Sequence, residues 1–276
     1  MYRTSPLKSV FFVAGLLVVH IIWAQAPSQK GYKIYYEMTF QKDSNDSKLT
    51  SEMTELLTSG GKSLFRTVLQ AEKDTNNYYV KSADNSLANV YTEASYRIFK
   101  DHENHSSRRY EVIEILGGPM CAYIESHDSM RWTLTSDTLT IHGYLCQRAS
   151  LHYGNRVWEA WFAPDIPISD GPYTFCGLPG LIVQIRDRTG SWLFNLTHIA
   201  HVPAFTFDLP FLEDAEVEVI EKMAFYKRKR YYTDNSMEIN EAKGSIWFDN
   251  EVMRQRILKT AKINAVKNNN WIELYP

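Results

Sequence analysis

The sequence predicts a mainly β protein, in which a curved or partly closed antiparallel sheet carries one C-terminal helix. Apolar and polar residues alternate over residues 32–41, as they do in half-buried strands. Short aromatic and apolar runs then recur along the chain, with turn signals between them at residues 154–155 and 187–190. A helical pattern occurs only late, at residues 250–264. Many sequential strands followed by one helix are typical of a meandering sheet.

The expected strands follow one another closely along the chain. After the strand at 32–41, residues 43–48 are polar and predict a turn. Further strands are expected at 63–69, 77–81, 96–100, 108–116, 120–126, 130–135, 144–153, 156–162, 181–187, 191–200 and 225–232. The helix at 250–264 should begin at Asp249 or Asn250, because either side chain can cap its first turn.

The turn at residues 154–155 joins two strands that can be paired residue by residue. A two-residue loop sets Tyr153 opposite Arg156 and Leu151 opposite Trp158. The buried side of this hairpin is then expected to hold Ala149, Leu151, Trp158 and Phe162.

The opposite face of the hairpin carries Arg148, Glu159 and Trp161, which are the binding candidates that the sequence offers. Arg148 would lie opposite Trp161, where a cation–π contact is possible. The three residues form either part of a ligand-binding face or ordinary cross-strand pairs. We favour the cross-strand pairs, because such pairs are the usual content of an antiparallel sheet.

The segment after the hairpin is stiffened by proline. Three prolines within residues 163–175 remove backbone donors, so this segment cannot be a central strand. Pro179-Gly180 suits the middle of a type II turn, which needs a positive φ at the glycine. The segment either presents a surface or plugs one end of the sheet with Tyr173, Phe175 and Leu178. We favour the plug, because these side chains are apolar and contain no acid–base pair.

The first residues resemble an export signal. Arg3 and Lys8 precede an apolar run from residue 10 to 23, which is short for a membrane span, so residues 1–24 are expected to be a signal peptide. An uncleaved anchor is the alternative. Residues 25–276 should then form a single β-rich domain that is periplasmic or secreted, with no later membrane span. Removing Arg3 and Lys8 leaves 28 basic against 32 acidic residues, a net charge of −4 that argues against nucleic acid as a partner.

One block of the chain resembles a known family. Gly143-Tyr144-Leu145-Cys146, the turn at 154–155 and the aromatic run at 160–162 precede Gly177-Leu178-Pro179-Gly180-Leu181-Ile182. The one-letter codes of the last six residues spell the name of the GLPGLI family of exported bacterial proteins, which occur mostly in Bacteroidetes. Residues 140–187 are similar to the signature of this family. The ending 270–274 is also similar, although Trp271 stands where the family has proline. The resemblance implies a cell-envelope setting near outer-membrane transport proteins, with no accepted catalytic residues to transfer.

The three cysteines allow at most one disulfide. Cys146 and Cys176 both lie in the signature block, so an oxidising compartment would favour a bridge between them, with Cys121 left over. Three reduced, buried cysteines remain the alternative. A bridge would stabilise the fold by roughly 3–4 kcal/mol in the chain-entropy model.

Other patterns are poor matches to known sites. His102 and His105, like His198 and His201, lack the spacing and companions of a zinc site, so they are expected at the surface or at strand edges and no metal is assigned. Residues 60–63 end like a phosphate loop without its first glycine, and no dinucleotide or nucleophile-elbow motif occurs. The basic run at 227–230 is flanked by aromatic residues, but the export signal favours a solvated or intramolecular role. No cofactor is expected.

Two functions remain open on these grounds. The first is a non-enzymatic binding or accessory protein, with an outer-membrane transport protein or another envelope component as its partner. The alternative is an envelope hydrolase whose site is assembled only in the fold, for example from His152, Glu159, Asp165 and Asp170. A pocket with converging, pKa-shifted groups would favour the enzyme, whereas a filled core with exposed apolar surface would favour binding.

Overall fold

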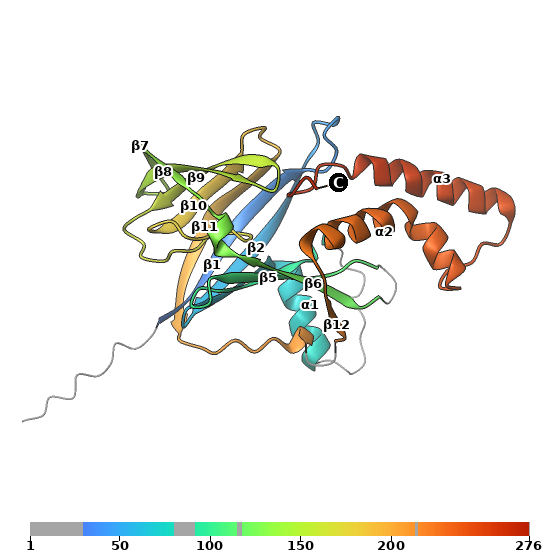
Figure 1. Ribbon diagram of the computed structural model, residues 1–276, viewed down its shortest axis with the longest axis horizontal. Helices are drawn as coiled ribbons and strands as arrows, with labels where there is room; N and C mark the ends of the chain where they lie inside the picture. The colour runs from blue at the N-terminus through green and yellow to red at the C-terminus, as the bar shows by residue number, and fades with distance from the viewer. Residues whose placement is uncertain (1–29, 80–91, 115–117, 213–214, 276) are drawn as a thin grey trace, which may run out of the picture.

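The computed structural model describes residues 30–79, 92–114, 118–212 and 215–275. The expected signal peptide at 1–24 lies outside these residues. Within them the chain forms a large curved sheet from which helices extend on one side (Figure 1).

The sheet has twelve described strands in the order β12-β6-β5-β4-β3-β2-β1-β11-β10-β9-β8-β7. Their bounds are β1 Lys30–Gln41, β2 Leu49–Ser59, β3 Lys62–Thr67, β4 Arg97–Asp101, β5 Ser106–Val112, β6 Met120–Ser126, β7 Thr133–Ile141, β8 Tyr144–Tyr153, β9 Arg156–Ala163, β10 Leu181–Asp187, β11 Trp192–Pro203 and β12 Val217–Val219. The predicted mainly β class is therefore confirmed. The sheet is open, because β12 and β7 form its two edges, and it is mixed, because β12 pairs parallel to β6.

The β8–β9 hairpin has the predicted register. Tyr153 lies opposite Arg156 and Leu151 opposite Trp158, as the two-residue turn requires. Ala149, Leu151, Trp158 and Phe162 are all buried in the main core, so the predicted face of the hairpin is also confirmed.

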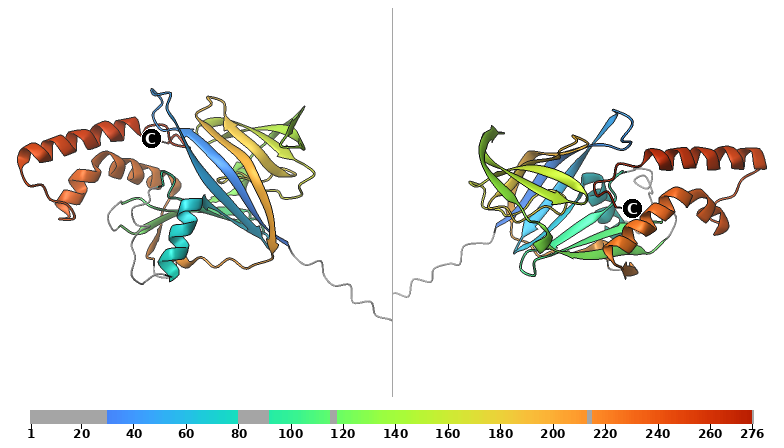
Figure 2. Two further views of the ribbon diagram at one scale, coloured as in Figure 1. Left: turned by 180° about the vertical axis from the view of Figure 1, so that it is seen from behind. Right: turned by 45° about the horizontal axis from the view of Figure 1, so that its top comes forward.

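Three α-helices of the described residues accompany the sheet: α1 (Val68–Tyr79), α2 (Lys222–Ala242) and α3 (Glu251–Lys267). The predicted C-terminal helix is α3, and the side chain of Asn250 caps it by accepting a 2.9 Å hydrogen bond from the Met253 amide. Figure 2 shows the same elements from two further sides, with α2 and α3 extending away from the sheet.

Two expected strands are wrong. Residues 77–79 end α1, while residues 80 and 81 lie outside the described chain, and residues 225–232 belong to α2. At 222–229 the buried or half-buried residues Lys222, Phe225, Tyr226 and Lys229 recur at helical spacing, which the alternation of aromatic and basic residues concealed.

The connection between β9 and β10, residues 164–180, fills the hollow of the sheet and is called the crossing below. Tyr173, Phe175 and Leu178 are at most 1% exposed, and they pack into the main core with Trp158. The crossing therefore plugs the sheet with apolar side chains, as expected from the sequence. The expected type II turn is wrong, because the Gly180 amide donates to the Leu178 carbonyl at 2.8 Å, which makes a γ-turn around Pro179.

Candidate functional site

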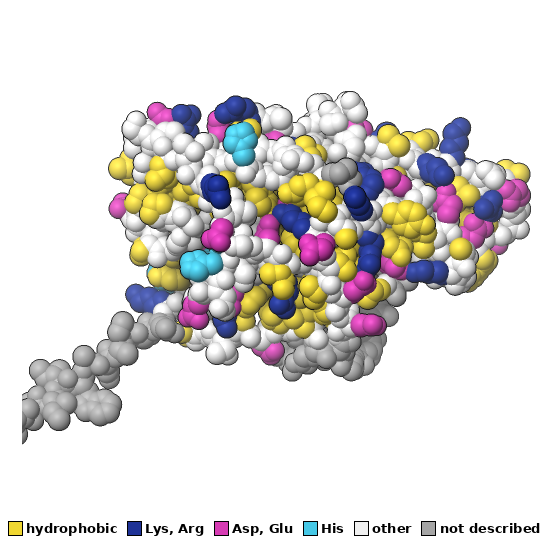
Figure 3. Space-filling model, viewed as in Figure 1, with side chains coloured by type: hydrophobic (Ala, Val, Ile, Leu, Met, Phe, Trp, Pro, Cys, Tyr) yellow, Lys and Arg dark blue, Asp and Glu magenta, His cyan; other side chains and the backbone are white. Residues whose placement is uncertain are grey.

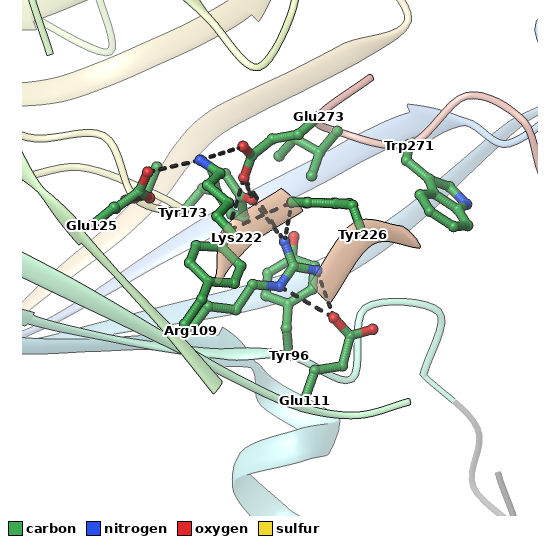
Figure 4. Close-up of polar contacts among 12 residues, drawn as sticks. Tyr96, Arg109, Glu111, Glu125, Tyr173, Lys222, Tyr226, Trp271 and Glu273 are labelled. Atoms are coloured by element: carbon green, nitrogen blue, oxygen red, sulfur yellow. Dashed lines mark hydrogen bonds and ion pairs between the residues drawn. The ribbon is translucent and has the colours of Figure 1, made fainter. Parts of the chain in front are cut away.

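A network of buried charges joins the sheet to α2 and to the end of the chain (Figure 4). At its centre lies Glu273, whose side chain is fully buried. One carboxylate oxygen of Glu273 lies 2.7 Å from the Lys222 ammonium, and the other accepts hydrogen bonds from the hydroxyls of Tyr123, at 3.1 Å, and Tyr173. We call this the Glu273 network. Its members are Arg109, Glu111, Tyr123, Glu125, Tyr173, Lys222, Tyr226, Lys229 and Glu273.

Strand and helix periodicities place the members of this network. Arg109 and Glu111 are two residues apart on β5, and so are Tyr123 and Glu125 on β6, so each pair points to one face of its strand. Arg109 pairs with Glu111 at 2.7 Å, and Lys229 from α2 reaches the other oxygen of Glu111 at 2.6 Å. The network thus fixes α2 against the sheet.

The end of the chain is anchored at the same place. The Leu274 amide donates to the Gly154 carbonyl at 2.8 Å, which ties the chain end to the turn of the β8–β9 hairpin. Arg156 donates to the carbonyl of Trp271 at 2.6 Å and pairs with Asp187 at 2.8 Å. Trp271, which replaces the proline of the resembling family, is buried under the Arg230 guanidinium, 4.0 Å from the ring centre.

Charges within the network compensate one another. Burial alone would raise the pKa of Glu111, but the charges of Lys229 and Arg109 outweigh it and lower that pKa to about 2. The pKa of Glu273 is likewise lowered, because Lys222 and Arg109 overcome the effect of burial. Burial raises the pKa of Tyr123, Tyr173 and Tyr226. At neutral pH the carboxylates of Glu111 and Glu273 are ionised and these three tyrosines are neutral, so the network is suited to holding structure together.

Acid should weaken the protein through this network. A lowered folded-state pKa stabilises the fold above the ordinary value of 4.5, and for Glu111 this contribution is lost as the pH falls toward about 2. The free energy of unfolding, measured by urea denaturation, should therefore decrease steadily over that interval. Glu111→Gln should be less stable at neutral pH and should show a shallower decrease. Equal pH slopes for the two proteins would contradict this assignment.

The alternative hydrolase residues do not form one site. Asp165 and His152 are exposed, while Asp170 is 1% exposed and lies in the crossing. Glu159 pairs at 3.2 Å with Arg186 on the neighbouring strand. Asp170 instead pairs with Lys100 at 2.5 Å and with the Nε2 atom of His102 at 3.0 Å.

A second polar group surrounds Asp170. His102, His127 and Cys176 place one nitrogen or sulfur donor each within 4.8 Å of one another, and we call these three residues the His–Cys cluster. Burial, followed by the neighbouring His102 and Lys100, lowers the pKa of His127 to about 4, while burial raises the pKa of Cys176 to about 12. The histidine is thus neutral and the thiol protonated, which does not suit a free nucleophile. The prediction of surface or edge histidines missed this group, because its members come from three separate segments.

The expected disulfide is not formed. In the part of the chain that the structure describes, Cys121, Cys146 and Cys176 are all free and buried thiols. Cys146 packs into the main hydrophobic core, whereas Cys176 faces the histidines of the His–Cys cluster. Membership of one sequence block did not bring the two sulfurs together.

The binding candidates on the β8–β9 hairpin make cross-strand contacts. Arg148 lies opposite Trp161 in the predicted register, but its guanidinium pairs with Asp137. Trp161 is half-buried against the main core. A ligand-binding role for Arg148, Glu159 and Trp161 stays a prediction.

A groove lies between α2 and α3. We call these helices and their connection, residues 222–267, the helical arm. The groove encloses about 650 Å³ and is lined mainly from α3. Its lining includes Glu238, Leu258, Lys259, Lys262, Ile263 and Val266. Hydrophobic, basic and acidic side chains are interspersed on the face of the arm that is visible in Figure 3. None of the described helices is long and apolar enough to span a membrane.

Comparison with known proteins gives a family of unknown function. A family described as a protein of unknown function (Porph_ging) matches residues 152–184, which run from the end of β8 through β9 and the crossing into β10. The match lies inside the block that resembles the GLPGLI family and carries no activity with it. No curated protein sequence matches the chain.

Solved structures add a likeness of fold. Two structures of PNGF-II, in C2 and P21 space groups, align at 15% and 16% identity, with a TM-score of 0.52 for each. They cover 72% of this chain, which spans about a third of PNGF-II. At this identity the likeness concerns the fold alone. Two further structures align at 9% identity with a TM-score of 0.25 each. A DUF1329 family protein from Desulfovibrio piger covers 65% of this chain and 88% of its own length. An outer membrane lipoprotein-sorting protein domain from Vibrio parahaemolyticus covers 72% of this chain and 91% of its own length.

Proposed function

We propose that this protein is an exported cell-envelope protein of the GLPGLI type that acts without catalysis. Residues 25–276 would be one periplasmic or secreted domain, and the helical arm would bind a partner linked to outer-membrane transport. The observation that supports this proposal is the apolar groove on an arm that extends away from a filled β core. The family resemblance supports the compartment.

The β core offers little space for a substrate. The crossing fills the hollow of the sheet with Tyr173, Phe175 and Leu178, which are almost fully buried. The carboxylates of the Glu273 network are paired with cations. Of the two cavities described, one lies between α2 and α3, and the other lies between α2 and Ile113. A filled core with compensated charges favours binding over catalysis.

The helical arm, in contrast, leaves apolar side chains in solvent. In α3, Ala265 is the one buried residue, while Val252 is 82% and Val266 is 72% exposed. Trp247, in the connection between the helices, is 81% exposed. Ion pairs hold the two helices together, since Lys262 reaches Glu238 at 3.0 Å and Arg254 reaches Glu241 at 2.6 Å. Among the apolar residues of the arm, Leu258, Ile263 and Val266 line one groove, and apolar surface gathered in this way is typical of a protein-binding site.

Charge indicates the chemistry of the partner. Five basic residues and one acidic residue lie on α3, and Lys259, Lys262 and Lys267 line the groove. An amphipathic segment with an apolar stripe and acidic flanks would complement such a surface. We therefore expect the partner to present an acidic amphipathic segment to the arm.

Affinity capture from envelope extracts tests this proposal. Val266→Asp and Ile263→Asp should each reduce capture of the partner by at least about tenfold, because a charge placed in an apolar contact is costly to bury. Leu145→Asp is the matched control, since Leu145 is similarly exposed at 58% but lies on β8. All variants should melt like the parent. Equal capture by the arm and control variants would contradict the proposal.

A further inference from the structure

We propose that the His–Cys cluster binds one transition-metal ion of the Zn²⁺ class. Its three donor atoms lie within 4.8 Å of one another. A single Zn²⁺ ion holds nitrogen at about 2.0–2.1 Å and sulfur at about 2.3 Å, so its ligand atoms end up somewhat closer together. Both histidines are half-buried, and small rotations of their rings would complete the approach.

Three separate elements deliver the donors. His102 follows β4, His127 opens the short 3₁₀ helix η2 (His127–Ser129) after β6, and Cys176 lies in the crossing. Cys176 is held in place by an isolated β-bridge to Asp170. Three segments that are distant in the sequence thus meet at this point.

Outer hydrogen bonds orient both imidazole rings. The Nε2 atom of His102 lies 3.0 Å from a carboxylate oxygen of Asp170, and the Nε2 atom of His127 lies 2.8 Å from the hydroxyl oxygen of Ser107. In the proposed site each ring donates a hydrogen bond through Nε2 and binds the ion through the lone pair of Nδ1. A carboxylate or hydroxyl behind a histidine is the usual support of a metal-binding imidazole.

The local charges allow a divalent ion. Lys100 and Asp170 are both buried and form an ion pair, so their charges offset each other beside the cluster. On binding, the Cys176 thiol would release its proton to solvent, and the thiolate would offset half of the charge of the ion.

The donor set selects the class of ion. Two imidazoles and a thiolate suit Zn²⁺ and similar ions, and they do not suit Mg²⁺ or Ca²⁺, which prefer oxygen. Both oxygens of Asp170 are engaged by Lys100 and His102, so the fourth position of a tetrahedral ion is left to water or another small ligand.

Co²⁺ titration of the full, reduced and metal-free chain tests the site. One equivalent of Co²⁺ should produce a thiolate-to-metal charge-transfer band in the near ultraviolet, and Zn²⁺ should displace it. Cys176→Ser should abolish this band, whereas Cys121→Ser and Cys146→Ser should keep it. The three substitutions are matched, because all three thiols are buried.

The histidine variants guard against a failure of Cys176→Ser to fold. His102→Gln and His127→Gln, at half-exposed positions, should weaken Co²⁺ binding at least about tenfold, and Ser107→Ala should weaken it about tenfold through the outer hydrogen bond. His152→Gln, at an exposed position on β8, should bind like the parent. The proposal is overturned if the parent binds no Co²⁺, if the band survives Cys176→Ser, or if the histidine variants bind normally.

Discussion

Glu273→Gln should lower the free energy of unfolding by about 3–5 kcal/mol, because it removes a fully buried carboxylate from between Lys222 and Arg109, which then keep only Glu125 and Glu111 as their partners. Lys222 lies 2.7 Å from one oxygen of Glu273, and Arg109 lies 4.0 Å from the other. Glutamine keeps the size of the side chain, so the change removes charge and leaves the packing nearly intact. Urea denaturation at neutral pH measures the effect.

Glu251→Gln is the control for this loss of charge. Glu251 also pairs with an arginine, but its side chain is 67% exposed, so the substitution should leave the free energy of unfolding nearly unchanged. Similar losses of stability for the two variants would show that the buried charge of Glu273 does not support the fold.

Gly180→Ala should cost about 2–6 kcal/mol, the combined range of backbone strain and overpacking. A Cβ atom at Gly180 would lie 2.2 Å from the carbonyl oxygen of Ala163, which belongs to the backbone of β9 and cannot swing away. The φ of Gly180 is +154°, a value that other residues rarely adopt. Thermal and urea denaturation measure the loss.

Gly177→Ala separates the two causes. Gly177 also has a positive φ, of +88°, but nothing lies within 4 Å of the Cβ that alanine would add. It should therefore cost only the backbone strain, about 1–3 kcal/mol. If Gly177→Ala and Gly180→Ala have the same melting temperature, the close approach to Ala163 is not what requires glycine at position 180.

Local signals predicted part of the fold well. The hairpin at residues 144–162 could be paired correctly because a two-residue turn fixes both register and face. The predicted strand at residues 225–232 is wrong because alternating aromatic and basic residues fit a strand as well as a helix. The contacts of Lys222 and Lys229 with the sheet favour the helix. The predicted type of the turn at Pro179-Gly180 is wrong because the close approach of the β9 backbone to Gly180 cannot be inferred from neighbouring residues.

The polar clusters could not be predicted, because their members are distant in the sequence. Tyr123 and Glu273 are 150 positions apart, and His102 and Asp170 are 68 apart. The sequence around each of these residues is that of an ordinary strand or turn. The helical spacing of Lys222, Phe225, Tyr226 and Lys229 was the one local signal that could have indicated a buried polar face.

Site-specific photo-crosslinking in intact cells tests the role of the helical arm most directly. A photoreactive residue at position 266, in the groove, should crosslink to an envelope protein, and the crosslinked peptide should be acidic and amphipathic. The same residue at position 145, which is exposed on β8, should give no such product. Crosslinking from position 145 but not from 266 would contradict the account, because the partner would then bind the sheet and leave the arm free.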